Sequence, residues 1–132
     1  MKYLLDAPVL AAAVRGRLPV VLRLAELKPG DVAVSVVSRV EVELGLRAQP
    51  RQQARQFRLL RELLASVRQL EFGAAEAQQA VQLAAYLQPS GERLNALDLQ
   101  VAATALAHQL ILVTERPEIF AALPGLDLEQ WR

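Results

Sequence analysis

The chain contains no cysteine and a single histidine, and both absences restrict the chemistry that it can perform. Without cysteine it has no disulfide, no thiolate nucleophile and no cysteine-ligated zinc. With His108 alone, one copy cannot assemble a histidine-based triad or a metal site with two histidine ligands. We expect His108 to lie near a helix end, where a cation is favourable. Any hydrolytic chemistry must therefore depend on carboxylates.

Strong net charge and long hydrophobic runs are also missing. The formal net charge is +1, so no global field draws the protein toward nucleic acid. The longest apolar candidate, residues 101–114, is interrupted by His108 and Gln109 and is shorter than the roughly 18 residues of a membrane helix. The first residues are typical of a strand ended by an acid rather than of a signal peptide, so we expect a cytoplasmic protein without a membrane partner. Aromatics are scarce, at 5%, and no motif for stacking RNA bases is evident.

What is present is a high apolar fraction in alternating strand-like and helix-like segments. With 132 residues, 53% of them apolar, the chain can form one domain, residues 1–132, around a single core. The alternation predicts an α/β fold with a central parallel sheet of four to five strands flanked by helices. Strands are expected over residues 2–5, 32–37, 67–72, 110–113 and 126–128, and helices over residues 8–15, 18–27, 38–45, 50–66, 74–88, 96–108 and 117–122.

Three carboxylates far apart in the sequence occupy positions that favour a common site. Asp6 follows the first expected strand, Glu41 lies one turn into the helix after the second, and Asp98 opens an alanine-rich helix. The carboxyl ends of parallel strands meet at one edge of a sheet, where α/β folds bind their ligands. Three acids that converge there would form an oxygen-rich site for a hard divalent cation.

Each acid also has a structural explanation, and these alternatives stay open from the residues alone. Asp6 could be the N-cap of the following helix. Ser38 and Glu41 match the S-x-x-E pattern of a capping box, and Asp98 lies in a first turn, where the helix dipole favours an anion. Glu43 is a near alternative to Glu41, but two positions apart on a helix the two side chains point in different directions. Three such residues beside strands favour a shared site.

Arginines gather between residues 47 and 68. Arg51, Arg55 and Arg58 fall on one face of the expected fourth helix, and Arg47 lies a turn earlier. This stripe could hold RNA phosphates, or it could be an ordinary solvated face.

The order of these blocks resembles a known family. The blocks are Lys2-Tyr3-Leu4-Leu5-Asp6, then Val36-Val37-Ser38 leading into Glu41-Val42-Glu43-Leu44-Gly45, then Asp98-Leu99-Gln100-Val101-Ala102-Ala103, then Leu112-Val113-Thr114. Over almost the whole chain this set is similar to PIN-domain proteins, and specifically to the VapC toxins of type II toxin–antitoxin pairs.

The resemblance implies a PIN-like fold that acts as a metal-dependent endoribonuclease, cleaving RNA with water activated by Mg²⁺ or Mn²⁺. Asp6, Glu41 and Asp98 match the family's first, second and third acids. Glu115 could supply the fourth carboxylate.

Two residues depart from the family pattern. Pro8 stands where members usually carry a polar residue two places after the first acid. Arg116 could bring a positive charge into the pocket and weaken a second metal. The alternative function is therefore a degenerate PIN-like domain that binds RNA or a protein partner without cleaving.

The resemblance further implies a homodimer and a cognate VapB-like antitoxin. We expect residues 18–66 to form a groove for an amphipathic antitoxin segment. A phosphatase or receiver-like domain is a third class. A receiver would carry adjacent acids near the first strand and a lysine late in the chain, whereas the only lysines are Lys2 and Lys28.

Overall fold

Short parallel strands form the middle layer of the fold. The computed structural model describes residues 1–49, 51 and 53–132, and within them the strands are β1 (Tyr3–Leu5), β2 (Val32–Ser35), β3 (Arg68–Leu70), β4 (Ile111–Val113) and β5 (Leu128–Glu129). They form one five-stranded sheet in the order β3-β2-β1-β4-β5, and each neighbouring pair is parallel. The predicted α/β class and parallel sheet are confirmed. β1 is central, so the residue after it lies in the middle of the carboxyl edge.

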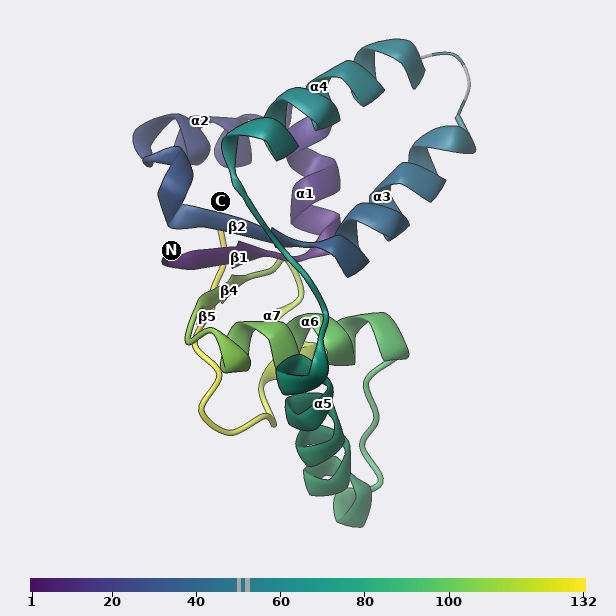
Figure 1. The fold of residues 1–132 in the computed structure, drawn as a ribbon, viewed down its shortest axis with the longest axis vertical. Coiled ribbons are helices and arrows are strands. Elements are labelled where there is room, and N and C mark those ends of the chain that lie inside the picture. Colours follow the sequence, from purple (N-terminus) through teal and green to yellow (C-terminus); the bar gives the residue numbers. More distant parts are fainter. Residues whose placement is uncertain (50, 52) are drawn as a thin grey trace.

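Helices cover both faces of this sheet (Figure 1). One side carries α1 (Ala7–Val14), α2 (Leu18–Glu26), α3 (Val36–Arg47) and α4 (Gln53–Ser66). The other side carries α5 (Ala74–Leu87), α6 (Ala96–Ala107) and the short α7 (Pro117–Phe120). Short 3-10 helices lie in the described connections, among them η1 (Pro29–Asp31) and η3 (Gln88–Ser90). Within the described residues, no helix is both long and apolar enough to cross a membrane.

Alternate side chains of the strands feed two separate cores, which is the pattern expected of a sheet buried on both faces. Leu5, Val34 and Val113 pack in one cluster with apolar residues of α1, α3 and α4. Leu4, Ala33 and Leu112 are fully buried in the other cluster, against residues of α5 and α6. The three-residue β1 is thus held on both sides, which fixes the direction in which the chain leaves it.

The start of α3 differs from the sequence prediction. The helix was expected to begin at Ser38 with a capping box to Glu41, but the N-cap is Ser35, whose Oγ accepts a hydrogen bond from the Val37 amide at 3.1 Å. Ser38 is instead buried, and its Oγ has no hydrogen-bond partner among the described residues. The capping-box interpretation is therefore wrong, because an earlier serine ends β2 and starts the helix. The predicted helix start at Pro50 lies outside the described residues, and α4 is described from Gln53.

The ends of two other helices agree with the sequence. Gly16, with φ +81°, follows the last turn of α1 in the left-handed conformation that glycine adopts most easily. His108 caps the end of α6 and pairs with Glu76 of α5, with 3.1 Å between Nε2 and Oε1. The hydrogen bond from His108 holds the pKa of Glu76 below its usual value. The one histidine is thus part of the packing of α5 against α6.

Candidate active site

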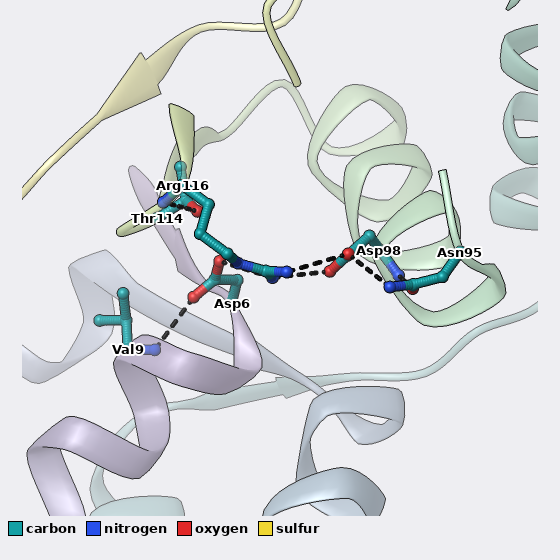
Figure 2. A network of polar contacts seen from close by, with 6 residues as sticks. All are labelled: Asp6, Val9, Asn95, Asp98, Thr114 and Arg116. Carbon is teal, nitrogen blue, oxygen red and sulfur yellow. Dashed lines mark hydrogen bonds and ion pairs between the residues drawn. The ribbon is translucent and has the colours of Figure 1, made fainter. Parts of the chain in front are cut away.

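Three connections place polar side chains at the carboxyl edge of the sheet. Asp6 follows β1, and its amide donates to the Val113 carbonyl at 3.1 Å, so it lies beside the end of β4. Thr114 and Arg116 follow β4 directly. The first turn of α6 brings Asp98 to the same place (Figure 2). The structure therefore brings together Asp6, which follows a strand, and Asp98, which lies in the first turn of a helix, at the edge of the sheet where the sequence placed them.

Asp6 is both a helix cap and a buried carboxylate. Its Oδ1 accepts from the Val9 amide at 3.0 Å, so the N-cap explanation is correct for this atom. The residue is only 1% exposed, and Oδ2 has no hydrogen-bond partner among the described residues. Burial raises the pKa of Asp6, although the nearby Thr114 hydroxyl, the Val9 amide and the charge of Arg116 oppose the rise. A cap needs one oxygen, and the second remains available for another partner.

Asp98 is oriented by a residue that the sequence reasoning missed. Asn95 is the N-cap of α6 and accepts from the Asp98 amide at 2.8 Å. Its side-chain Nδ2 also donates to Asp98 Oδ2 at 2.8 Å. The Asn-x-x-Asp spacing was the available signal, because asparagine is a preferred N-cap. Asn95 therefore holds the Asp98 carboxylate in one orientation.

The side chain of Arg116 lies between the two acids, as Figure 2 shows. Its Nη2 and Nη1 donate to Asp98 Oδ1 and Oδ2 at 2.9 and 3.3 Å, a two-pronged contact. Nη2 also lies 3.8 Å from Asp6 Oδ2, which is an ion pair but too long for a hydrogen bond. We call Asp6, Asp98 and Arg116 together the Arg116 clamp. The clamp is tight toward Asp98 and loose toward Asp6.

The charge of Arg116 is retained in this setting. Partial burial opposes it, but the hydrogen bond and charge of Asp98, followed by the charges of Asp6 and Glu41, raise the pKa of Arg116. The Arg116 amide donates to Thr114 Oγ1 at 3.0 Å, which fixes the backbone. Its Nε is buried without a hydrogen-bond partner among the described residues. The guanidinium is therefore a permanent cation whose bonding to the site is incomplete.

Glu41 is exposed on α3 and faces a cavity beside the clamp. The cavity, about 290 Å³ in volume, is lined by residues of α1 and α3 that include Pro8, Arg15 and Glu41, together with Gln49 and Gln56. Glu41 influences Arg116 through its charge, but no hydrogen bond joins the two. Glu43, the near alternative, pairs with Arg39 at 2.7 Å and is thereby engaged elsewhere. Of the two glutamates, Glu41 is the one near the site.

Glu115 points to another partner. Its carboxylate forms an ion pair with Arg17, which stands at the start of α2. It is Arg116, the next residue, whose side chain faces Asp6 and Asp98. The proposed metal role of Glu115 stays a prediction that would require its release from Arg17.

The residues fit a divalent cation in their chemistry, although Arg116 stands between the acids. In the part of the chain that the structure describes, no three histidine, cysteine or acidic side chains are grouped closely enough to hold a metal. Asp6 and Asp98 do face one cation, and each lies so close that the charge of Asp98 raises the pKa of Asp6. A buried carboxylate oxygen without a hydrogen bond is a suitable ligand for Mg²⁺ or Mn²⁺. Metal binding by Asp6, Glu41 and Asp98 stays a prediction.

The predicted RNA-binding arginines lie on the surface. Arg51, Arg55 and Arg58 are exposed, and Arg47 lies over the Phe57 ring, 5.3 Å from its centroid. Arg55 lines a second cavity of about 190 Å³ with Arg15 and Gln56. These last two side chains also line the Glu41 cavity, so the two hollows adjoin. Arg15 was missed because it lies outside the arginine-rich segment between residues 47 and 68.

Comparisons with known proteins agree with the fold. The family model described as the PIN domain matches residues 3–125. A curated relative from Shigella flexneri, the "tRNA(fMet)-specific endonuclease VapC", is 24% identical over 131 residues, which are 99% of this chain and 98% of that protein.

Solved structures of toxin–antitoxin proteins share the fold. VapBC2 from Rickettsia felis, bound to a promoter DNA fragment, superposes with a TM-score of 0.90 and 23% identity over 100% of both chains. FitAcB from Neisseria gonorrhoeae gives a TM-score of 0.78 and 28% identity over 96% of this chain and 95% of that one. Because the family model matches nearly the whole length, this chain belongs to the PIN domain family.

Proposed function

We propose that this chain is a metal-dependent endoribonuclease of the VapC type and the toxin of a toxin–antitoxin pair. One observation carries the proposal: Asp6 and Asp98 are buried side by side at the carboxyl edge of the sheet, and both face the same cation. A purely structural pair of acids would not need this arrangement, because burying two like charges together is costly. The similarity to a VapC endonuclease supports the same reading.

Each residue of the site would have a separate role in this reaction. Asp6 and Asp98 would hold the metal, with Glu41 contributing from the rim of the neighbouring cavity. The bound ion would lower the pKa of a water molecule, neutralise the phosphodiester and stabilise the leaving oxygen. Asn95 keeps Asp98 in place, and the Val9 amide keeps Asp6 in place, so neither acid has to be ordered when substrate arrives.

The adjoining cavities give the substrate a route past the acids. Glu41 stands in the first cavity, Arg15 and Gln56 lie where the two meet, and Arg55 lines the second. Arginines can bind phosphates with two hydrogen bonds, which suits a strand whose scissile phosphate lies at Asp6 and Asp98. We propose that RNA runs along this line, with Arg15 and Arg55 binding flanking phosphates and Arg47, Arg51 and Arg58 adding charge outside it.

Protein partners are proposed from the exposed apolar side chains and from the related complexes. Leu18 and Leu22 of α2 and Val40 and Leu44 of α3 are each more than half exposed. Contiguous apolar surface of this kind marks interfaces. Solved relatives that share the fold include VapBC complexes. A VapB-like antitoxin segment and a second copy of this chain are the proposed occupants of these helices, which lie within the predicted region of residues 18–66.

The alternative function, a PIN domain that binds RNA or a protein without cleaving, is favoured by one specific observation. Arg116 already pairs with both acids and offsets part of their charge, so the site has a cation without a metal. The two functions differ in whether a divalent metal enters the site, and cleavage assays separate them.

The first prediction concerns cleavage. Purified protein should cut RNA in Mg²⁺ or Mn²⁺ and stop when EDTA is added. Asp98→Asn should reduce the rate at least about a hundred-fold, because it removes the charge of a proposed ligand without changing its size. Glu43→Gln is the matched control, since Glu43 pairs with Arg39 away from the acids, and it should leave the rate unchanged. Absence of cleavage across a broad panel of RNAs, with metal bound, would favour the non-cleaving alternative.

A second prediction concerns stability in metal-free buffer. Because burial raises the pKa of Asp6, its charged form destabilises the fold, and this cost grows as pH rises through the pKa of the folded state. Asp6→Asn removes the charge but can still cap α1, so its free energy of unfolding at pH 7 should equal or exceed that of the native chain. Asp6→Ala also loses the cap and should be about 1 kcal/mol less stable than Asp6→Asn. Urea denaturation measures both, and a clear loss of stability in Asp6→Asn would contradict the account of this residue.

A third prediction concerns the RNA route. Arg55→Gln and Arg15→Gln should each weaken RNA binding and reduce the slope of log affinity against log salt by roughly 0.7, the value for one phosphate contact on a single strand. Arg68→Gln makes the same charge change at an exposed residue where β3 begins, which lines neither cavity, and should leave the slope unaltered. Binding is measured with the inactive Asp98→Asn background. Equal slopes in all variants would remove the proposed route.

A further inference from the structure

The Arg116 clamp places a permanent cation where the two proposed metal ligands meet. Arg116 contacts both oxygens of Asp98 and pairs with Oδ2 of Asp6, the oxygen that lacks a hydrogen bond. A divalent cation held by the same two carboxylates would need these oxygens. The guanidinium and the metal would therefore compete for these oxygens, and their positive charges would repel each other. On the basis of the proposed metal-dependent function, we propose that Arg116 competes with the catalytic metal for the two acids. The metal must displace Arg116 before it can bind there.

The clamp cannot open by losing its charge. An arginine side chain stays protonated throughout the physiological range, and here the neighbouring acids hold its pKa still higher. Only another cation can take its place at the acids. A group that binds the guanidinium more strongly could also draw it away from them. Loading of the site thus depends on the concentration of divalent metal.

The bonding of Arg116 makes the exchange feasible. The contact to Asp6 is long at 3.8 Å, and Nε has no hydrogen-bond partner among the described residues, so leaving the site sacrifices mainly the Asp98 contact. The side chain is 36% exposed, so one side already opens to solvent. Water could satisfy all five donors of a displaced guanidinium, including Nε.

The backbone around Arg116 confines the exchange to its side chain. Its amide is bonded to Thr114 Oγ1, and Pro117 begins α7 immediately afterwards. Thr114 is itself fully buried after β4. Displacement therefore requires rotation about the side-chain bonds of Arg116, while Asp6, held by the Val9 amide, and Asp98, held by Asn95, stay where they are.

The clamp also explains how the metal-free protein tolerates two buried acids. Asp6 and Asp98 repel each other, and the charge of Arg116 offsets this repulsion. Removing Arg116 should consequently have two opposite effects: it should destabilise the metal-free fold and strengthen metal binding. A residue with only a structural role would produce the first effect without the second.

The test is a titration of the protein with Mn²⁺. Binding is measured by calorimetry and by the electron paramagnetic resonance signal of the free ion. Arg116→Gln should bind Mn²⁺ at least about tenfold more tightly than the native chain, since it loses both the competing hydrogen bonds and the repelling charge. Its melting temperature in EDTA should fall, and added Mn²⁺ should raise that temperature more than it does for the native chain. Arg17→Gln is the matched control, because Arg17 pairs with Glu115 rather than with Asp6 or Asp98.

Two further measurements keep the outcome decisive. Arg116→Ala with methylguanidinium in solution should regain stability in EDTA, and the added cation should weaken Mn²⁺ binding as the native side chain does. If Arg116→Gln folds poorly, Arg116→Lys provides the comparison, since lysine keeps the charge but cannot contact both carboxylates with a planar fork. Equal Mn²⁺ affinity in native, Gln and Lys chains would overturn the competitor role and leave the proposed function intact. Absence of Mn²⁺ binding in every variant would overturn both.

Discussion

The repulsion between two buried carboxylates is the constraint on which the rest of this site depends. Asp6 ends the central strand and Asp98 opens α6, so the fold forces both into a place with little water. A cation that lies between the acids stabilises such a pair in its charged form. In this chain Arg116 supplies that cation, and its position at the end of β4 follows from the same sheet edge.

The precision of the arrangement comes from short elements with well-defined caps. β1 has only three residues, yet its side chains pack alternately into two cores, so the position of Asp6 after it is fixed. One oxygen of Asp6 caps α1, while Asn95 caps α6 with its side-chain oxygen and donates its side-chain nitrogen to the Asp98 carboxylate. Local helix chemistry and the shared site are therefore not competing explanations. The caps hold the carboxylates, and the free oxygen of Asp6 gives the site its demand for a cation.

The sequence predicted the fold class, the parallel sheet and the meeting of Asp6 and Asp98, because hydrophobic alternation and strand ends are local signals. It placed the start of α3 at Ser38 rather than after Ser35, since both serines fit a cap and the residue at which β2 ends decides between them. Arg116 was recognised as a departure from the family pattern. Its contact with Asp98 could not be read from the chain, because rotation about its side-chain bonds allows many positions. Glu115 and Arg17 are 98 residues apart in the sequence, and no local pattern predicts that they pair.

The family pattern and Arg116, which departs from it, therefore explain different features of this protein. Membership of the PIN domain family accounts for the sheet and its helical layers. Arg116 contacts both acids of the site and so changes what they pair with before any metal arrives. In the proposed mechanism, the carboxylates of Asp6 and Asp98 bind either the guanidinium of Arg116 or a divalent metal.

The most direct measurement is a pair of crystal structures, one grown in EDTA and one in Mn²⁺, with anomalous scattering recorded at the manganese edge. The account predicts no anomalous peak in EDTA, with Arg116 on Asp98. It predicts a peak between Asp6 and Asp98 in Mn²⁺, with the Arg116 side chain turned to solvent. A peak at those two acids while Arg116 keeps both contacts to Asp98, or no peak there at saturating Mn²⁺, would contradict it.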